Sequence, residues 1–337
     1  MNITNHSERF ATLGRRVRPA LLAALLFPLL LLGSCVLEDM DNCAQYKLTV
    51  KIVGTDGYEL PSGTVDTVNV YLFDEAGFVR MVSTDKSGDL MFGYDKDQEL
   101  TLVAWGNLKK DSLVVPTLTK GESPEEALVE LRKLEDYDLS STDLFYARYT
   151  VRGDSVVEAT EATATAVAVV GEGTVTASSS SLAGLRSSGA SSDTLTLSLE
   201  RMVASLSITG KYMSERFGTD TASYHFVVRS TKDALNFLGS PAGDTASYVP
   251  GTSVDADEQL VTPVIRVLPT PTDETLIIDL YRGDSLLYST TTDSDGNALQ
   301  AIAGKQLNVV LIFSYSFVRV TVTVTPWGEE VVQDTEL

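Results

Sequence analysis

The sequence predicts an all-β protein in which two tandem β-sandwiches follow an N-terminal export signal and tether. Three observations support this fold class. Apolar and polar residues alternate along most of the 337 residues, which is typical of strands with one buried face. Turn residues separate the alternating runs, and helical patterns are scarce. A Gly/Ser-rich loop or linker at residues 171–193 separates two groups of strands.

The chain begins with the pattern of a bacterial export signal at residues 1–34. Four arginines precede an apolar run from Ala20 to Leu32. That run is shorter than the roughly 20 apolar residues that a membrane-spanning helix needs. It therefore fits the apolar core of a cleaved signal peptide. The paired Arg15 and Arg16 leave a twin-arginine signal as an alternative.

The end of this signal, Leu32-Gly33-Ser34-Cys35, resembles the lipobox of bacterial lipoproteins. Small residues suit the cleft of a peptidase, and the thiol of Cys35 is the nucleophile that takes up diacylglycerol. Cleavage before Cys35 frees an amine for a further acyl chain, and two or more chains hold a protein firmly in a membrane. We therefore predict lipidation at Cys35. A chance cysteine behind an ordinary signal peptide is the alternative.

Three acidic residues follow the cysteine closely: Glu38, Asp39 and Asp41. Acids in this place resemble the signal that sends Bacteroidota lipoproteins to the outer face of the outer membrane. We therefore predict that residues 35–44 are a lipidated tether and that the protein is exposed at the cell surface. An ordinary solvated linker is the alternative.

Charge and cysteine content exclude one class of partner and one kind of stabilisation. Without residues 1–34, the chain keeps 22 basic and 45 acidic side chains and has a net charge of −23. Nucleic acid binding depends on basic patches, so we expect no nucleic acid partner. Cys35 and Cys43 are the only cysteines. If Cys35 carries lipid, Cys43 has no disulfide partner, and apolar cores must stabilise the domains.

The alternating runs assign strands to both domains. In the N-terminal domain, residues 45–192, they lie at 46–53, 65–73, 78–82, 99–105, 145–151 and 155–159. In the C-terminal domain, residues 193–337, they lie at 194–209, 225–229, 261–268, 275–281, 286–290, 307–315 and 317–324. Many short strands with turns between them favour sandwiches.

One helix is predicted within the N-terminal domain. Ser123-Pro124-Glu125-Glu126 combines a cap residue, proline at the first helical position and glutamate at the third. Ala127, Leu128, Leu131 and Leu134 would then share one helical face. Such a helix would cover the end of a sheet or fill a crossover between strands.

Two stretches resemble each other, "YTVRGDSVVEAT" at 149–160 and "DLYRGDSLLYST" at 279–290. Their similarity predicts that one sandwich occurs twice, with the Arg-Gly-Asp-Ser turns at equivalent corners. Recurrence of an ordinary Gly-Asp hairpin is the alternative. Arg-Gly-Asp binds integrins in other proteins, but the turn preferences of glycine and aspartate explain both copies.

The sequence offers little material for catalysis. His225 is the one histidine outside residues 1–34 and lies in a strand pattern, so a zinc site with several histidines is excluded. Asp293-Ser-Asp-Gly-Asn297 lacks the closing glutamate of a calcium loop, and we interpret it as a hairpin turn. We expect no enzyme, cofactor, metal or small-molecule substrate. Of the two tryptophans, Trp105 is expected in the core, whereas Trp327 is expected to be freer.

Several segments resemble the FimB-type anchor subunits of Bacteroidota type V fimbriae. They are Cys35, the acidic stretch ending in Asn42-Cys43, "VNVYLFDEAGFV" at 68–79, "LTLVAWGN" at 100–107 and "LSLERMVASLSITG" at 197–210. The resemblance spans most of the chain behind residue 34 and is a pattern of strands and turns. It implies two transthyretin-like (Greek-key) sandwiches and a role at the fimbria base. The protein would hold a fimbrial shaft to the outer membrane through its lipid anchor and limit the length of the shaft.

Contacts in such fimbriae use strand addition, in which a strand of one subunit completes a sheet of another. The candidate strands here are Tyr46–Val53 and Phe317–Val332. We expect the second to pair within its own domain, because the residues after Gly328 are mostly polar. Two other functions remain open. A tip or shaft fimbrillin of the same fold would lose its first strand by proteolysis, and a surface glycan-binding lipoprotein would show an exposed aromatic platform.

Overall fold

The computed structural model describes residues 43–54, 57–61, 63–85, 89–95, 97–152, 155–160, 194–218, 223–229 and 232–327. Ala44–Leu337 is one compact unit, and Met1–Cys43 is a separate unit. Within the described residues nearly every element is a strand, and the one helix is the five-residue α2 (Met213–Phe217). The predicted all-β fold class is therefore confirmed.

The first sandwich is built by an eight-stranded sheet. In order across the sheet its strands are β3 (Gly77–Asp85), β2 (Thr67–Asp74), β5 (Glu99–Gly106), β10 (Phe145–Arg152), β12 (Thr194–Arg201), β1 (Cys43–Val53) and β4 (Asp89–Asp95), and β11 (Ser155–Thr160) pairs with β10. Val70 of β2 and Leu197 of β12, from opposite parts of the sheet, belong to one buried cluster. The sheet therefore closes over a core of its own.

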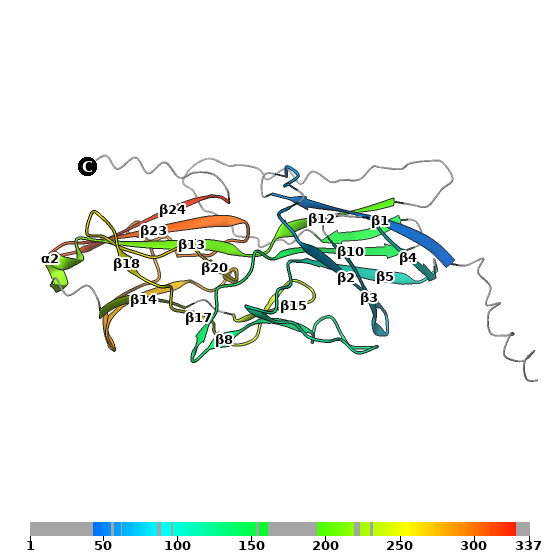
Figure 1. Ribbon diagram of the computed structural model, residues 1–337, viewed down its shortest axis with the longest axis horizontal. Coiled ribbons are helices and arrows are strands. Elements are labelled where there is room, and N and C mark those ends of the chain that lie inside the picture. Colours follow the sequence, from blue (N-terminus) through cyan, green and yellow to red (C-terminus); the bar gives the residue numbers. More distant parts are fainter. Residues whose placement is uncertain are drawn as a thin grey trace, which may run out of the picture. The chain divides into compact units, whose positions relative to one another are not determined.

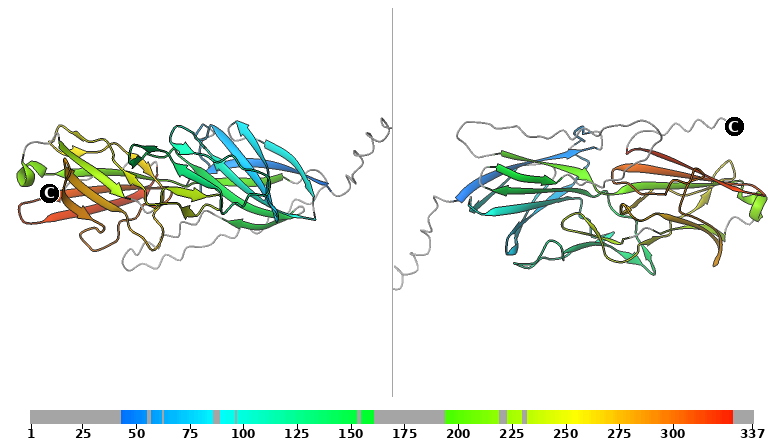
Figure 2. Two further views of the ribbon diagram at one scale, coloured as in Figure 1. Left: turned by 90° about the horizontal axis from the view of Figure 1, so that it is seen from below. Right: turned by 180° about the vertical axis from the view of Figure 1, so that it is seen from behind.

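The second sandwich has two sheets. The six-stranded sheet has the order β18 (Ser253–Val254), β19 (Leu260–Val261), β13 (Ala204–Lys211), β23 (Lys305–Phe313) and β24 (Val318–Pro326), with β20 (Ile265–Val267) pairing β13. The four-stranded sheet has the order β17 (Ser247–Tyr248), β14 (Tyr224–Arg229), β21 (Ile277–Arg282) and β22 (Ser285–Thr290). Leu206 and Val309 from one sheet and Phe226 and Ile278 from the other share one core. In every view β23 and β24, coloured orange and red, lie side by side (Figures 1 and 2).

Short strands join the two sandwiches. The small sheets are β16 (Pro241–Ala242), β15 (Ala234–Asn236), β7 (Leu128–Leu131) and β6 (Leu113–Val114), and the pair β8 (Lys133–Leu134) and β9 (Tyr137–Asp138). Phe237 follows β15 and packs edge-on against Tyr71 of β2, with ring centroids 4.7 Å apart. Tyr71 and Trp105 belong to the same buried cluster as the core of the second sandwich. The strands β2 and β5 therefore have apolar contacts on both faces. One face lines the core of the first sandwich, and the other belongs to the cluster that continues into the second sandwich.

The predicted helix at 123–134 is wrong. The hydroxyl oxygen of Ser123 accepts a hydrogen bond from the backbone N–H of Glu125 (3.2 Å), which closes a turn. The chain then forms β7, whose residues pair with β6 on one side and β15 on the other. Ala127, Val129 and Leu131 alternate as buried residues, whereas Leu134 is 66% exposed. The cap signals are used by the turn, and pairing with a strand about 100 residues away overrides the local helical pattern.

The domain boundary predicted between residues 192 and 193 lies before β12, whereas β12 is a strand of the first sheet. β12 pairs parallel with β1 from Lys47 opposite Thr194 to Val53 opposite Glu200, so it completes the first sheet. The second sandwich begins with β13, and two buried residues, Met202 and Val203, separate the two strands. Because the apolar alternation continues through them, the sequence pattern shows no border there. The Gly/Ser-rich stretch at 171–193 lies outside the described residues.

The two Arg-Gly-Asp-Ser turns are locally similar, since Arg152 pairs with Ser155 and Arg282 pairs with Ser285 in hairpins with matching register shifts. The strands also have comparable neighbours. β10 pairs antiparallel with β5 and forms its hairpin with β11, and β21 pairs antiparallel with β14 and forms its hairpin with β22. The equivalence of the two corners stays a prediction. The sandwiches share a further feature, because each pairs its first strand in parallel with the strand that follows this hairpin, β1 with β12 and β13 with β23. The transthyretin-like connectivity stays a prediction.

Candidate functional site

The predicted modification and export residues, Cys35, Glu38, Asp39 and Asp41, lie outside the described residues, and so does the rest of the tether before Cys43. In the described part of the chain, no helix combines the length and the apolar character needed to cross a membrane. The geometry that bears on function is therefore that of the two terminal strands and of the junction between the sandwiches.

The first candidate exchange strand, β1, lies inside its sheet. It is hydrogen-bonded between β12 on one side and β4 on the other. Leu48, Val50 and Ile52 point into the first core and are 0%, 3% and 1% exposed. The first sandwich is thus completed by a strand of its own chain.

The second candidate, β24, lies at the edge of the six-stranded sheet, beside β23 (Figure 1). It forms nine residue pairs with β23, from Val318 opposite Phe313 to Pro326 opposite Lys305. The expectation that this run pairs within its own domain is confirmed as far as Pro326. The residues after Trp327 lie outside the described part of the chain.

A loop blocks part of the outer edge of β24. The backbone N–H of Val320 donates to the hydroxyl oxygen of Ser294 (2.7 Å), and the carbonyl of Val320 accepts from the N–H of Ser294 (3.0 Å). Backbone groups in a paired strand point alternately to either side. Val322 and Val324 therefore direct their N–H and C=O groups to the same outer side as Val320, beyond the reach of this clip.

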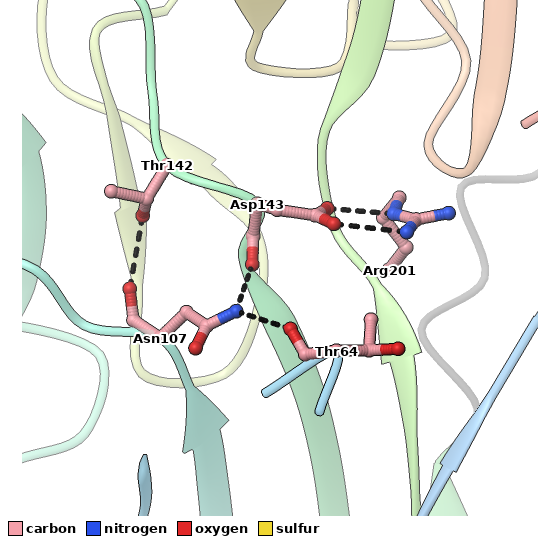
Figure 3. A network of polar contacts seen from close by, with 5 residues as sticks. All are labelled: Thr64, Asn107, Thr142, Asp143 and Arg201. Carbon is pink, nitrogen blue, oxygen red and sulfur yellow. Dashed lines mark hydrogen bonds and ion pairs between the residues drawn. The ribbon is translucent and has the colours of Figure 1, made fainter. Parts of the chain in front are cut away.

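The junction contains a buried ion pair, drawn in Figure 3. Arg201, the last residue of β12, donates from Nε and Nη2 to the two carboxylate oxygens of Asp143, at 2.6 and 2.9 Å. The side chain of Arg201 is 8% exposed and that of Asp143 is 19% exposed. The guanidinium also lies over the rings of Phe145 and Trp327, 5.0 and 4.3 Å from their centroids. Bidentate pairing with stacking is the geometry for which arginine is best suited.

Asn107 holds the loop that carries Asp143. Its side-chain Nδ2 donates to the carbonyl oxygens of Thr64 (3.1 Å) and Asp143 (3.0 Å), and its own carbonyl accepts from the hydroxyl of Thr142 (2.9 Å), as Figure 3 shows. Its Oδ1 also accepts from the N–H of Asp66. Asn107 has a φ of 61°, a left-handed conformation that asparagine tolerates better than most residues. A buried amide thereby fixes the position of the Arg201 partner.

Trp327 is more closely packed than the sequence predicted. It is half-buried, packs against the core of the second sandwich and donates from its backbone N–H to the carbonyl of Gly304 (3.1 Å). Its ring lies against Arg201 and, at 5.8 Å, against Arg266. Trp105 is fully buried, as predicted. Both tryptophans are therefore packed within the fold.

A second polar cluster ties β8 and β9 to the start of β17 and to Asp233, which precedes β15. Asp138 has a 2% exposed side chain, and its Oδ2 accepts from the N–H of Ser247 (2.7 Å). Burial raises the pKa of Asp138 above its ordinary value. Lys133 forms an ion pair with Asp233 at 3.2 Å, and the hydrogen bond to Asp233 is the main reason that the pKa of Lys133 is raised. Among the described residues, no group of three or more histidine, cysteine or acidic side chains is arranged to hold a metal ion.

Other sequence candidates have structural partners. Oδ1 of Asp293 accepts from the N–H groups of Asp295 and Asn297, and its Oδ2 accepts from the Asn297 amide. These bonds, that of the Asn297 side chain first, lower the pKa of Asp293 and confirm the predicted hairpin turn. His225 stacks on Tyr281 across β14 and β21, with ring centroids 5.5 Å apart.

Comparisons with known proteins complete the description. Residues 40–333 match the family model described as "Fimbrillin-A associated anchor proteins Mfa1 and Mfa2". The chain is 24% identical over 312 residues to the "Major fimbrium anchoring subunit FimB" of Porphyromonas gingivalis, covering 88% of this chain and 90% of that protein. None of these descriptions names an enzyme.

Solved structures share the fold. The fimbrial anchor protein Mfa2 from Porphyromonas gingivalis superposes with a TM-score of 0.57 at 13% identity, over 85% of this chain and 98% of that chain. A Bacteroides thetaiotaomicron structure described as a putative polysaccharide binding protein gives a TM-score of 0.58 at 15% identity, over 87% of this chain and 100% of that chain. At these identities the likeness concerns the fold alone.

Proposed function

Because the chain belongs to the family of fimbrillin-A associated anchor proteins, we propose that it is a lipid-anchored subunit at the base of a fimbria. In this proposal it attaches the fimbrial shaft to the outer membrane through strand-mediated contacts and limits the length of the shaft. The membrane attachment is the lipid on Cys35, and the acids Glu38, Asp39 and Asp41 direct the protein to the cell surface.

The observation that carries the proposal is the position of β1. Its buried residues Leu48, Val50 and Ile52 complete the first sandwich from within the same chain. Such a sandwich does not need the strand of another subunit to complete its core. A subunit of this kind joins a polymer by one interface and ends its growth, which is the behaviour that length limitation requires.

The tether length is consistent with a position at the membrane. Cys35 and Cys43 are separated by a short segment of the chain, which at about 3.3 to 3.6 Å for each residue spans at most about 30 Å. The first sandwich would therefore remain near the lipid headgroups. A strongly acidic protein gains no electrostatic attraction from an anionic membrane, so the acyl chains must supply the attachment.

The test of the anchor compares the two cysteines. Cells carrying Cys35→Ala should lose fatty-acid label on the protein and release fimbriae into the medium, because the shaft no longer has a membrane attachment. Cys43→Ala is the matched control and should keep both label and attached fimbriae. Label that persists on Cys35→Ala, or fimbriae that stay on those cells, would refute the proposal.

The surface assignment has its own test. Replacing Glu38, Asp39 and Asp41 with alanine should protect the protein from protease added to intact cells. Replacing the exposed Glu125 and Glu126 instead is the control, and that variant should be degraded like the unmodified protein. Equal degradation of all three forms would show that the acids do not direct export.

A further inference from the structure

Strand directions define two ends of the described unit. β1 and β12 run parallel, and β12 ends at the junction with Arg201. β13 and β23 run parallel away from the junction, where the N–H of Gly304 donates to the carbonyl of Val203. The turn between β23 and β24 therefore lies at the end of the second sandwich away from the junction. The start of β1, where the tether enters, lies at the end of the first sandwich away from the junction.

Three large aromatic side chains are exposed at this end of the second sandwich. Tyr315 and Phe317, in the β23–β24 turn, are 81% and 58% exposed, and Tyr212, before α2, is 48% exposed. We call these three residues the aromatic tip. Tyr315 has the highest exposure of any large apolar side chain in the described residues. Exposed aromatic groups that gather in one place are unusual on a protein surface and mark interaction sites.

The backbone under the aromatic tip is held in place. Nη1 of Arg216 donates to the carbonyl oxygens of Ser314 and Phe317, both at 3.1 Å. The N–H of Phe317 donates to the hydroxyl oxygen of Ser314 (3.1 Å) and closes the turn. Tyr212 has φ 59° and ψ 30°, a left-handed conformation that a bulky residue adopts at a cost. The tip is thus ordered before any partner binds, which reduces the entropy lost on binding.

Charged side chains of both signs border this end of the second sandwich. Lys211, Arg216, Arg282 and Arg319 lie in or beside the elements that meet here. Glu215 and Asp284 lie beside them, and the turn between β18 and β19, which lies next to the end of β13, adds Asp255, Asp257 and Glu258. A partner for this surface should therefore present an apolar patch whose rim carries charges of both signs.

We propose that the aromatic tip binds the adjoining fimbrial shaft subunit through such a patch. This inference rests on the proposed function, since a shaft must extend away from the membrane. The tip lies at the opposite end of the described unit from the start of β1, so a subunit bound there would extend away from that end. Tyrosine and arginine are enriched among the residues that dominate protein interfaces.

The test uses the full-length lipoprotein in detergent micelles and fimbriae sheared from cells. The variant combines Tyr212→Gly, Tyr315→Ser and Phe317→Ser. Glycine suits the left-handed conformation of residue 212, and the other two side chains are exposed, so the fold should be preserved. We expect affinity for sheared fimbriae to fall about 30-fold or more, as for a hot-spot cluster.

Tyr58→Ser is the matched control, because Tyr58 is 75% exposed in a loop of the first sandwich. This variant should leave the affinity for sheared fimbriae unchanged. A deletion of the gene separates this inference from the proposed function. Fimbriae that stay attached to deletion cells would refute the proposed function itself. If deletion releases fimbriae but the triple variant binds them normally, the inference about the tip is wrong. The inference is also wrong if the triple variant loses only binding to a glycan or to a second copy of this chain.

Discussion

The strands β1 and β24 resemble each other in sequence but differ in what they do in the fold. Both alternate β-branched and polar residues. β1 is paired on both sides, and its Val50 is 3% exposed, whereas β24 is paired on one side, and its Val324 is 47% exposed. The first sandwich is therefore closed by its own N-terminal strand. The second sandwich keeps an edge, part of which Ser294 covers.

In the proposed assembly, position in the sheet rather than strand composition would decide which terminal strand can take part. An inner strand loses hydrogen bonds on both sides and a share of the core when it leaves. An edge strand can gain a neighbour without losing any pairing. A first sandwich completed by its own strand suits the proposed subunit that ends a polymer, and β24 is an edge of the second sandwich that could still gain a neighbour.

The largest expected effect tests this contrast with two valines. Val50→Asp places an unpaired charge in the first core and should lower the free energy of unfolding by about 4 kcal/mol or more. Val324→Asp places the same group on the edge strand and should cost about 1 kcal/mol or less. Urea unfolding of both variants measures the difference. Similar losses for the two variants would contradict the assignment of β1 as an inner strand and β24 as an edge.

The next effect concerns the junction between the sandwiches. Arg201→Met leaves the carboxylate of Asp143 partly buried without its partner and should lower the free energy of unfolding by about 3 kcal/mol. Lys51→Met is the control, because Lys51 and Glu59 form an ion pair with side chains 46% and 59% exposed, and such pairs contribute about 1 kcal/mol or less. Equal effects in thermal or urea unfolding would show that the junction pair is no stronger than a surface pair.

A smaller effect isolates the end of β24. A chain that ends at Trp327 should be more stable than one that ends at Pro326 by about 1 to 2 kcal/mol, because the indole stacks on the buried Arg201 guanidinium. Calorimetry of the two truncated proteins measures this difference. The difference should shrink when both carry Arg201→Met. An unchanged difference in that background would mean that the indole acts through other contacts.

The smallest effect is a pH dependence from Asp138. Its pKa is raised in the folded state above the ordinary value of 3.8, so folding favours the protonated form. The contribution of this group to stability is present below 3.8 and is lost as pH rises through its folded pKa. Asp138→Asn should remove that part of the decline in unfolding free energy, measured by urea titration at several pH values. Asp136→Asn, at an exposed position of the same hairpin, is the control, and a steeper decline in Asp138→Asn would reverse the assigned sign.

Strands with strict alternation could be predicted from the sequence, because one buried face leaves a period of two in β1 and β12. The turn at Ser123 could not, since the same cap residues serve a helix and a turn, and pairing with β15 decides between them. The boundary between the two sandwiches could not be predicted, because the residues at it, Met202 and Val203, are buried and continue the apolar pattern of the strands on either side. The clip between Ser294 and Val320 joins residues that no local pattern connects. The contact of Trp327 with Arg201 also depends on chain segments far apart, so its burial was missed.

The most direct test of a closed, membrane-bound subunit is the identity of the N-terminus in protein recovered from fimbriated cells. Mass spectrometry should find the segment Cys43–Val53 still joined to the rest of the chain, behind an acylated Cys35. That result is expected of a subunit whose first sandwich is closed by its own strand and which stays in the membrane. A mature chain that begins after Val53 would contradict this assignment, because its first sandwich would be open to the strand of another subunit, as in a shaft or tip fimbrillin.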